Sequence, residues 1–468
     1  MRVLVLGGGA REHAIALALR QAEAEVAVAS PNTNPGLEAI ARESRRIDPT
    51  LPEPVVAFAK QSKMDLVVVG PEAPLAAGVA DALRAQGIPV VGPSVAGARL
   101  ETSKPYCREL LTKYGLDVSP KHVVVREADR LTAAVAEIGG PFVVKPAGLT
   151  SGKGVRVQGL DFVPDEVGMA YAKQLLDSGP GEVVLEERLE GEEFSLMAFV
   201  TDSGVFPMPA VQDYKRALEG DLGGNTGGMG SYSQRDHLLP FLAGSARDAA
   251  LDVLKRTVEA LRQEGISYRG VLYGGFMLTR RGPALLEFNA RFGDPEAINV
   301  LTLYEEGDFA ELLRGVAEGR VDPNLVRFRL RATVVKYLVP PGYGSKPTAG
   351  GILKVDEPAI SALGVHVLYG NVDRVGGYGL RLTSSRAVAL VGEASAIHEA
   401  GIRVESALAH VEGDYYVRHD IGTKADLSKR TEHMRQLLVP GAKPSPLPLS
   451  VAPPGAPPSS AASASQVI

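Results

Sequence analysis

Short apolar runs alternate with helical patterns over the first hundred residues, and this alternation limits the possible fold more than any other feature. The runs are Val3–Leu6, Val26–Ala29, Leu66–Val69 and Pro89–Val91, with one helix predicted after the first run up to Leu19 and another around Ala76–Ala85. Short apolar runs between helical patterns are typical of a parallel sheet with helices on both faces. We therefore predict an α/β domain at residues 1–103.

The rest of the chain is long enough for further domains. The chain has 468 residues, 45% of them hydrophobic, which is more than one core accommodates. Four strand patterns and a helix at 122–190 predict a small, mobile sheet unit within a larger domain at 104–325. Mixed patterns predict a small α+β domain at 326–427. After Arg435 the chain turns to Pro, Ala and Ser, and we expect residues 428–468 to form a disordered tail.

Charge and cysteine content narrow the classes of partner. The net charge is −5 and the sequence pI is near 6.0, so nothing favours nucleic acid or an anionic membrane as a partner. Cys107 is the only cysteine, which excludes an intrachain disulfide, and we expect it to be a buried apolar residue. The apolar runs are too short for a membrane span or a signal peptide. We expect a cytoplasmic protein that acts on small molecules.

A glycine-rich loop with two lysines lies at Lys145–Gly154. Such a loop can cradle a polyphosphate with its backbone N–H groups, although a solvated surface lysine is the ordinary alternative for each lysine. A P-loop needs four residues between its first glycine and Gly-Lys, followed by Ser or Thr. Here three residues separate Gly148 from Gly152, and Gly154 follows the lysine. The loop therefore predicts a phosphate site of another kind.

A second polar segment, Glu287–Glu296, reads EFNARFGDPE. Side chains alternate along a strand, so Glu287 and Asn289 share one face, and Arg291 joins them if the strand continues. Two hard oxygen ligands suit Mg²⁺, which borrows phosphate oxygens from a nucleotide. A buried structural Asn–Glu pair is the alternative interpretation.

The N-terminal glycine turn at residues 7–9 precedes Arg11, Glu12 and His13. It lacks the third glycine of a dinucleotide fingerprint, and the next strand is not followed by the acidic residue that binds ribose. A phosphate of another ligand fits a glycine turn at a helix N-terminus. His13 either helps to hold that phosphate or makes a local hydrogen bond at the helix start. The turn Gly70–Pro74 is either a ligand-binding turn or a rigid proline turn.

Taken in order, eight motifs resemble the phosphoribosylamine–glycine ligase family of the ATP-grasp superfamily, over about residues 1 to 425. They are Gly8–His13, Gly70–Leu75, Ser103–Lys104, Lys145–Gly154, Gln212–Arg216, Asn225–Gly230, Glu287–Glu296 and Arg418–Gly422. The Pro-Ala-Gly-Leu-Thr form of the loop resembles the archaeal-type branch. The chain departs from the common family pattern at Pro146-Ala147, Tyr214 and Gly224, which affects the closing geometry of the loop.

The resemblance implies a fold and a reaction. It implies a Rossmann-like N-terminal domain, an ATP-grasp core whose mobile lid spans about 122–190, and a small C-terminal α+β domain. The reaction would join glycine to 5-phosphoribosylamine through glycyl phosphate, using ATP with Mg²⁺ or Mn²⁺, in purine biosynthesis. We expect a monomer or a small homo-oligomer.

Site residues follow from the same resemblance. Those implied to bind the nucleotide are Lys104, Lys145, Gly152, Lys153, Gly154, Glu186, Arg188, Leu189 and Glu193, and Glu287 and Asn289 are implied to hold the metal. Those implied to bind the other substrates are Gly8, Gly9, Arg11, Glu12, His13, Pro71, Glu72, Asn225, Gly227, Gly228, Met229, Arg291, Gly293 and Asp294. Catalytic roles are implied for Arg291, Lys153 and Asp213. Arg291 would bind the glycine carboxylate or the acyl phosphate, and Asp213 would orient the attacking amine. Glu186 would face the adenine amino group.

Two alternatives stay open from the sequence. One is another ATP-grasp carboxylate–amine ligase or a carboxylase, which would use a different acid. The other is a catalytically silent nucleotide-binding module, which would bind ATP without releasing phosphate.

Overall fold

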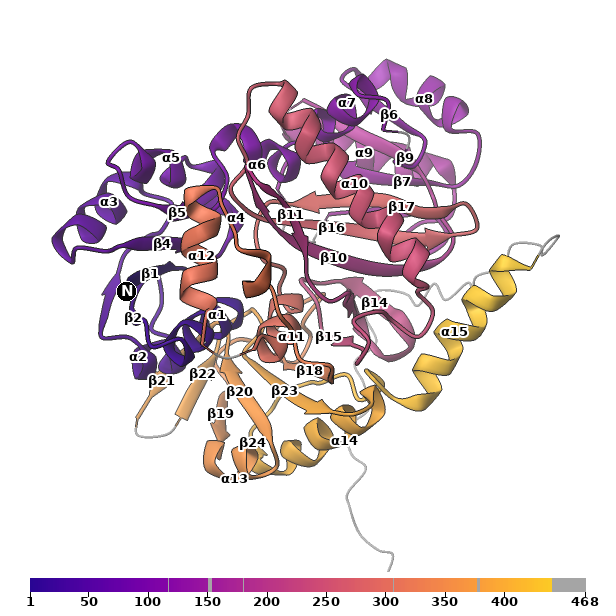
Figure 1. The fold of residues 1–468 in the computed structure, drawn as a ribbon. Coiled ribbons are helices and arrows are strands. Elements are labelled where there is room, and N and C mark those ends of the chain that lie inside the picture. The colour runs from indigo at the N-terminus through magenta and orange to yellow at the C-terminus, as the bar shows by residue number, and fades with distance from the viewer. Residues whose placement is uncertain (117, 150–153, 180, 306, 377–378, 440–468) are drawn as a thin grey trace, which may run out of the picture.

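The computed structural model describes residues 1–116, 118–149, 154–179, 181–305, 307–376 and 379–439. Within these residues the strands form six sheets, and the chain runs from an N-terminal unit through a lid and a central sheet to a C-terminal unit (Figure 1). No helix in this described part is long and apolar enough to cross a membrane. The predicted multidomain α/β and α+β architecture is confirmed.

The N-terminal sheet is parallel throughout, in the order β3-β2-β1-β4-β5. Its strands are β1 Arg2–Leu6, β2 Glu25–Ser30, β3 Glu43–Arg46, β4 Leu66–Val69 and β5 Val90–Val91, and its helices are α1 Ala10–Gln21, α2 Pro35–Ile40, α3 Pro52–Gln61, α4 Glu72–Ala76, α5 Val79–Arg84 and α6 Val95–Thr102. Every residue of Val3–Leu6 and Leu66–Val69 is buried, as a sheet covered by helices on both faces requires. The helix predicted around 76–85 is α5, and a short helix, α4, precedes it; Gly78, with a left-handed φ of 81°, separates the two.

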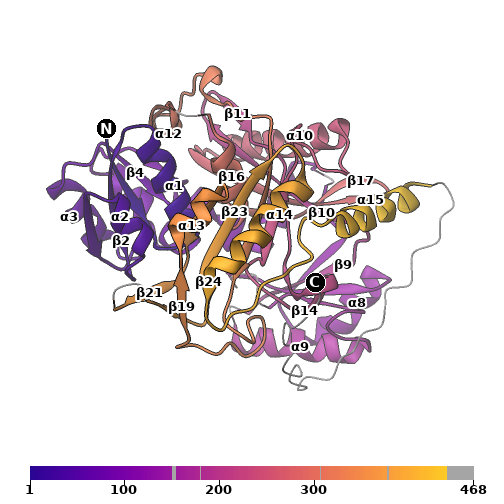
Figure 2. The same cartoon turned by 90° about the horizontal axis from the view of Figure 1, so that it is seen from below.

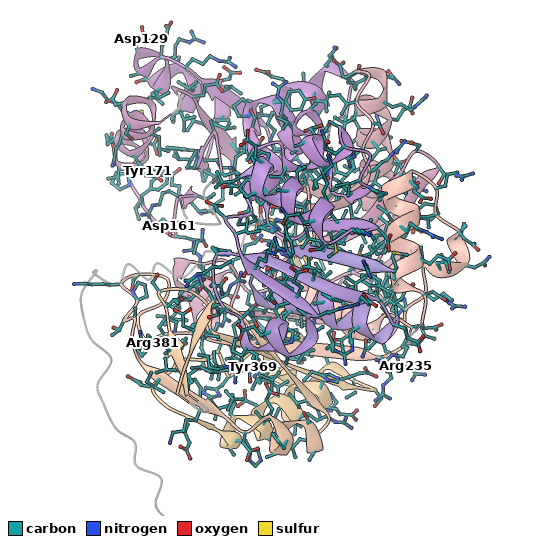
Figure 3. The ribbon with its side chains drawn as sticks, turned by 90° about the vertical axis from the view of Figure 1, so that its left-hand side faces the viewer. Asp129, Asp161, Tyr171, Arg235, Tyr369 and Arg381 are labelled. Atoms are coloured by element: carbon teal, nitrogen blue, oxygen red, sulfur yellow. The ribbon has the colours of Figure 1, made fainter. Side chains whose placement is uncertain are left out.

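The lid region has a sheet and a core of its own. Helix α7 Lys104–Lys113 leads into the antiparallel sheet β6-β9-β7-β8. Its elements are β6 His122–Val125, α8 Leu131–Ile138, β7 Phe142–Pro146, β8 Arg156–Val157, α9 Asp165–Ser178 and β9 Val183–Glu187. Phe142, Phe162 and Leu185 belong to a core that is separate from the main one. In Figure 3 the labelled lid residues Asp129, Tyr171 and Asp161 lie at one end of the molecule.

The central sheet is antiparallel, in the order β11-β10-β16-β17, and the long helix α10 Gly244–Gln263 packs against it (Figure 1). Its strands are β10 Glu192–Thr201, β11 Gly204–Pro207, β16 Gly270–Thr279 and β17 Gly282–Asn289. Helices α11 Glu296–Leu303 and α12 Phe309–Glu318 follow β17, and α11 packs against α1 of the N-terminal unit. The end of β17 therefore lies close to the N-terminal unit.

One five-stranded sheet, β12-β15-β18-β23-β20, joins the middle of the chain to its C-terminal part. It combines β12 Gln212–Asp213 and β15 Gly230–Ser233 with β18 Ala332–Leu338, β20 Val365–Tyr369 and β23 Val388–Ala394. A hairpin of β13 Arg216–Leu218 and β14 Leu222–Asn225 lies between β12 and β15, and α14 Ile397–Ala407 packs on β18 and β23. A smaller sheet, β21-β22-β19-β24, is built from β19 Ile352–Val355, β21 Val372–Val375, β22 Gly379–Leu382 and β24 Val411–Glu412, with α13 Glu357–Ala362 nearby in sequence. A sheet therefore crosses the predicted boundary between residues 325 and 326.

The C-terminal helix corrects one prediction. Residues 428–468 were expected to be a disordered tail, but α15 spans Lys424–Leu438. Its buried apolar residues are few, Met434 and Leu437, so the sequence pattern gave little sign of a packed helix. Buried ion pairs, described below, attach it to the rest of the molecule. Residues 440–468 lie outside the described part of the chain.

Candidate active site

The predicted metal ligands lie at the C-terminal end of strand β17. Glu287 and Asn289 are half-buried and flank Phe288, which is buried, so the two polar side chains share a face as predicted. They are paired across the sheet with Gly275 and Tyr273 of β16. No group of three or more His, Cys, Asp or Glu suited to a metal occurs among the described residues. Two oxygen donors on one face of a strand suit a divalent cation that takes its remaining ligands from water and phosphate.

Three lysines and Arg291 surround the Glu287 carboxylate. Burial alone would raise the pKa of Glu287, but Lys215, Lys145, Lys104 and Arg291 outweigh burial and lower it. Glu287 is therefore an anion at neutral pH, with four cationic side chains close enough to stabilise its charge. Such a setting suits a polyphosphate that arrives with its own divalent cation.

Lys104 and Lys145 come from two different elements and meet at this face. The Nζ of Lys145 pairs with Glu186 at 2.6 Å and donates to the carbonyl of Leu286 at 3.1 Å. Lys104 begins α7, and its Nζ donates to the carbonyl of Gly148 at 2.9 Å, so this lysine holds the start of the glycine loop. Burial lowers the pKa of Lys104.

The loop itself is described only in part. Gly152 and Lys153 lie outside the described residues. Gly154 has a φ of 133°, which favours glycine, and its carbonyl accepts a hydrogen bond from the Tyr171 hydroxyl at 2.7 Å. This bond ties the end of the loop to α9 of the lid.

Glu186 lies between two cations. Its carboxylate contacts Arg108 Nη2 at 2.7 Å and Lys145 Nζ at 2.6 Å, and all three side chains are buried. Burial would raise the pKa of Glu186, but Arg108 and Lys145 outweigh it and lower the pKa. The expected contact between Glu186 and an adenine amino group stays a prediction.

The linker between β9 and β10 carries the remaining nucleotide residues. The N–H of Arg188 donates to the Pro141 carbonyl at 2.8 Å, and its side chain donates to the Gln158 carbonyl at 2.8 Å. Leu189 is half-buried. Because the Arg188 amide is already bonded within the lid, a ring edge placed here would meet the Arg188 carbonyl or the backbone of Leu189.

Glu193, Asp213 and Lys215 form a second charged group beside Glu287. Lys215 Nζ pairs with Glu193 at 2.8 Å. Burial raises the pKa of Asp213 to about 7, with Glu296, Glu193 and Glu287 adding to this and Lys215 opposing it. Asp213 therefore changes charge near neutral pH, which is compatible with the predicted role beside an amine.

Arg291 is held by four partners. Its guanidinium contacts Glu72 at 3.3 Å and Glu101 at 3.0 Å, and donates to Asn289 Oδ1 at 3.1 Å and to the Phe292 carbonyl at 3.2 Å. Strand β17 ends at Asn289. The condition under which Arg291 would share a strand face with Glu287 and Asn289 is therefore not met. The contact with Glu72, which follows Pro71 after β4, brings the Gly70–Pro74 turn to the end of β17. The role of Arg291 in binding a carboxylate stays a prediction.

The N-terminal glycine turn is closed by an internal ion pair. Glu12 accepts the N–H of Gly9 at 2.7 Å and pairs with Arg11 at 2.6 Å, and both side chains are buried. Arg11 also donates to the Phe292 carbonyl at 3.1 Å, so this turn reaches the same segment as Glu72. At Gly8, an added Cβ would lie 2.1 Å from the Asn32 side chain, so the turn leaves no room for a side chain there.

His13 makes a long-range contact rather than the local hydrogen bond that was one of its two interpretations. Its ring stacks on Tyr369 with centroids 5.9 Å apart, and its Nδ1 accepts the Tyr369 N–H at 3.0 Å. Figure 3 labels Tyr369 in the C-terminal unit. Burial lowers the pKa of His13 to about 4, so the ring is neutral at pH 7. Phosphate binding by His13 stays a prediction.

The glycine segment after Asn225 meets Asp294 through Arg386. Asn225 ends β14, Met229 is buried, and the Gly293 N–H faces the sulfur of Met197 at 3.3 Å. Arg386 donates to the carbonyl of Gly227 at 2.6 Å, lies within 3.4 Å of that of Gly228, and donates to the Asp294 carbonyl at 2.8 Å. It also pairs with the Asp294 carboxylate at 2.8 Å. One guanidinium from the C-terminal unit thus holds two predicted substrate segments together.

Sequence reasoning missed several residues of this site. Lys215 lies in the Gln212–Arg216 motif, so the motif could have identified it from the sequence. Arg386, Arg108 and Glu101 belong to no such segment, and their contacts join residues far apart in the chain.

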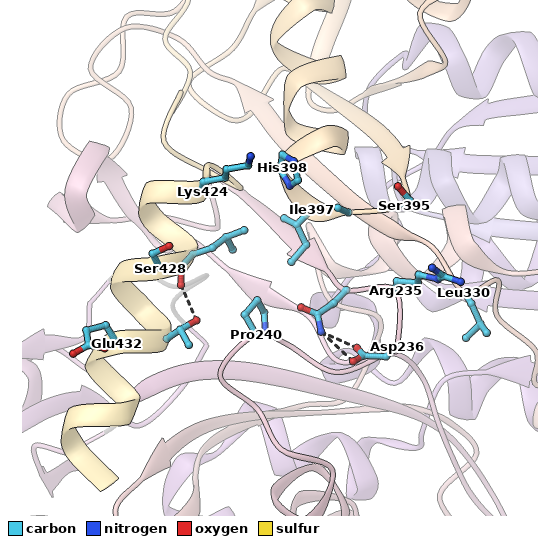
Figure 4. A pocket seen from close by; sticks show the side chains of 14 residues that line it. Arg235, Asp236, Pro240, Leu330, Ser395, Ile397, His398, Lys424, Ser428 and Glu432 are labelled. Atoms are coloured by element: carbon cyan, nitrogen blue, oxygen red, sulfur yellow. Dashed lines mark hydrogen bonds between the residues drawn. The ribbon is translucent and has the colours of Figure 1, made fainter. Parts of the chain in front are cut away.

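A pocket of about 1030 Å³ lies elsewhere, between α14, α15 and the loop 234–240 (Figure 4). Its walls include Arg235, Leu330, His398 and Lys424, and none of its lining residues is a predicted site residue. The pocket is therefore separate from the charged face of β17.

The chain is similar to one family over most of its length. Residues 1–101 match the phosphoribosylglycinamide synthetase N domain, and residues 102–297 match the ATP-grasp (A) domain of the same synthetase. A phosphoribosylamine–glycine ligase from Pyrococcus abyssi is 45% identical over 437 residues, covering 93% of this chain and 98% of that protein. One from Methanoregula boonei is 45% identical over 438 residues, covering 93% of this chain and 100% of that protein.

Solved structures share the fold. The phosphoribosylamine–glycine ligase of Thermotoga maritima superposes with a TM-score of 0.75 at 28% identity, covering 90% of this chain and 100% of that chain. A biotin carboxylase domain from Hydrogenobacter thermophilus, solved with magnesium ADP and bicarbonate, gives a TM-score of 0.68 at 16% identity, with 93% of each chain covered. At that identity the second likeness concerns the fold alone.

Proposed function

Because the chain belongs to the phosphoribosylamine–glycine ligase family, we propose that it activates glycine as glycyl phosphate at the face of β17 that carries Glu287 and Asn289. It is an ATP-dependent ligase of purine biosynthesis that joins glycine to 5-phosphoribosylamine. The observation that supports the proposed location best is the position of Lys145, whose Nζ donates to the carbonyl of Leu286, the residue before Glu287. Together with Lys104 and Lys215 it lowers the pKa of Glu287.

The charged face suits transfer of a phosphoryl group to a carboxylate. Two anions must approach one another in this step, so the site has to neutralise charge and align the reacting atoms. Lys104 and Lys145 would neutralise the phosphates of ATP, and the segment to Gly154 would close over them. Glu287 and Asn289 would hold Mg²⁺ or Mn²⁺, which when bound neutralises developing charge on the phosphates.

The second half of the reaction needs a held amine. Phosphoribosylamine attacks the acyl carbon, phosphate leaves, and the new amide nitrogen loses a proton. Asp213, which changes charge near pH 7, would accept a proton or orient the amine. The glycine turn at residues 7–9 and the segment 225–229 would hold the ribose phosphate and glycine, with Arg291 at the carboxylate.

The nucleotide would lie between the lid and the central sheet. Glu186, the backbone of Arg188 and Leu189, and Glu193 would contact adenine and ribose. We further propose that the enzyme acts in the cytoplasm on small-molecule substrates, as a monomer or a small homo-oligomer.

Replacing Glu287 tests the location of the site. Glu287→Gln keeps the shape of the side chain and removes its charge, and we expect metal-dependent ADP release to fall about 100-fold or more, since metal ions contribute several kcal/mol to such steps. ADP release would be measured with glycine and phosphoribosylamine in Mg²⁺ and in Mn²⁺. Glu259→Gln, on the exposed face of α10, is the matched control.

Two outcomes would contradict the proposal. Wild-type turnover in Glu287→Gln would exclude the metal assignment. Turnover with bicarbonate or another amino acid in place of glycine would instead point to a different substrate for the same fold.

A further inference from the structure

Helix α15 is attached to the start of β10, directly after the linker that joins the lid to the central sheet. The two elements lie side by side in Figures 1 and 2. Glu192 is the first residue of β10 and is buried, although its side chain is a carboxylate. A buried carboxylate needs partners, and α15 supplies them.

Both oxygens of Glu192 are bound from α15. Arg430 Nη1 lies 3.0 Å from Oε2, and His433 Nδ1 lies 2.7 Å from Oε1. The Gln212 amide lies 3.3 Å from Oε2 and also donates to the main-chain carbonyl of Glu193 at 2.9 Å. The position of Glu193 is therefore linked to the position of the helix.

Arg430 is itself fixed on several sides. It pairs with Asp426 at 2.9 Å and with Asp221 at 2.8 Å, and its guanidinium lies 4.6 Å from the centre of the Tyr214 ring. The Tyr214 hydroxyl donates to Asp426. Removing one member of such a buried network leaves the charges of its partners buried and unpaired, which is costly. The network therefore favours the single arrangement in which every member is paired.

The network ends at the predicted nucleotide site. The Glu193 carboxylate pairs with Lys215 at 2.8 Å, and Lys215 is one of the cations that lower the pKa of Glu287. Gln212 is held in turn by the Tyr232 hydroxyl, which donates to its Oε1 at 2.5 Å. A continuous set of contacts thus leads from α15 through Glu192, Gln212 and Glu193 to Lys215. Lys215 in turn acts electrostatically on Glu287 of β17.

We propose that Arg430 and His433 of α15 are positioning residues for nucleotide binding: they fix Glu192, and Gln212 transmits that position to Glu193. The inference rests on the proposed function, in which Glu193 contacts the nucleotide. It assigns to the last described helix a part in ATP affinity, although the helix contributes no residue to the predicted site.

The test is ATP binding to the full chain, measured by calorimetry in the presence of Mg²⁺ and without glycine. Arg430→Met and His433→Gln should each weaken ATP binding about tenfold, while the KM for glycine stays within about twofold of wild type. Arg430→Lys keeps a cation and should recover part of the affinity. Arg435→Met is the matched control, because Arg435 lies on the same helix and pairs with the exposed Glu432.

A double variant tests the route through Glu192. If Arg430 acts through Glu192, Arg430→Met should weaken binding little further once Glu192→Gln is present. Full additivity of the two losses would exclude this route. So would variants that unfold at lower temperature but bind ATP as tightly as Arg435→Met.

The outcomes separate the two proposals. Should Arg430→Met fail to fold, His433→Gln decides the matter, because its side chain is partly exposed. A wild-type chain that binds no ATP would overturn the proposed function. A wild type that binds ATP but does not use glycine would overturn the substrate assignment, while the positioning role would still be decided by the binding data.

Discussion

Asp213 and Lys215 lie two residues apart in the sequence, and they differ in protonation behaviour at neutral pH. Burial raises the pKa of Asp213 to about 7 and, for Lys215, is outweighed by Asp213 and Glu193, so the pKa of Lys215 is raised well above its usual value. At pH 7 the lysine is charged and the aspartate is partly protonated. Glu287 and Lys215 therefore keep their charges at pH 7, while Asp213 changes its protonation state.

The raised pKa of Asp213 gives a pH dependence of stability in the free enzyme. Between pH 4 and pH 7 the folded chain binds more protons at this residue than the unfolded chain, so its contribution to the free energy of unfolding declines as pH rises through that window. Asp213→Asn should remove this loss, gaining about 2 kcal/mol relative to wild type between pH 4 and pH 8. Urea unfolding at several pH values measures the difference.

Asp252→Asn, on the exposed side of α10, serves as the control for that experiment. A difference between wild type and Asp213→Asn that is constant with pH would show that Asp213 does not titrate in this range.

Residue types and alternation allowed part of the site to be predicted. Glu287 and Asn289 were placed on one face because a strand repeats every second residue, and this is confirmed. Lys145 was singled out by the glycines after it. Arg386 could not be found in this way, since its partners Gly227 and Asp294 lie far from it in sequence and the loop before β23 has no pattern of its own.

At the scale of elements, uninterrupted apolar runs were predicted most accurately. The bounds expected for Leu66–Val69 are those observed. The polar edge strand Glu43–Arg46 and helix α3 were missed, since the first has no apolar face to mark it. Most of helix α15 was predicted to belong to the disordered tail for a related reason. The helix is held by ion pairs, and ion pairs do not produce the periodic apolar pattern by which a packed helix is recognised in a sequence.

Arg386 connects the loop before β23 to two other segments, so its replacement tests how far that loop shapes the site. In Arg386→Met the carbonyls of Gly227 and Asp294 lose their shared donor, and we expect kcat/KM for phosphoribosylamine to fall at least about tenfold, because small displacements of positioning groups are costly. The KM for ATP should change little. Steady-state kinetics with each substrate varied in turn measures this.

Arg386→Lys should recover little, because a single ammonium cannot replace a fork that binds carbonyls and a carboxylate together. Arg381→Met, an exposed change on β22 of the same unit, should leave the kinetics unchanged. An equal rise in the KM for ATP would mean that Arg386 supports the site as a whole.

At the scale of the whole molecule, His13 and Asn34 join the N-terminal unit to the C-terminal unit. Asn34 caps α2 with its side-chain oxygen, while its amide donates to the carbonyls of Gly8 at 3.0 Å and Tyr369 at 2.7 Å. His13 stacks on the same tyrosine. The glycine turn is therefore held by a strand end more than three hundred residues away in sequence.

His13 also predicts a pH dependence of opposite sign to that of Asp213. Its pKa is lowered from 6.5 to about 4, so between these values the unfolded chain binds more protons and stability rises with pH. The stabilisation is present above pH 6.5 and is lost as pH falls through about 4, a change of about 3 kcal/mol. His13→Gln keeps an acceptor for the Tyr369 N–H and should flatten the unfolding free energy over this window.

His398→Gln, at the rim of the pocket in Figure 4, is the control. If His13→Gln retains the wild-type slope between pH 4 and pH 6.5, another group is responsible for it.

The sheet β12-β15-β18-β23-β20 has a consequence for synthesis of the chain. Gly230–Ser233 emerges from the ribosome well before its neighbour Ala332–Leu338, and β15 pairs with that neighbour along its whole length. Until translation has passed residue 338, one edge of β15 lacks its partner strand β18. The glycine segment before β15 is then next to an incomplete sheet. The sheet that carries β12 and β15, next to the predicted active site, is therefore completed only after the C-terminal strands have been synthesised.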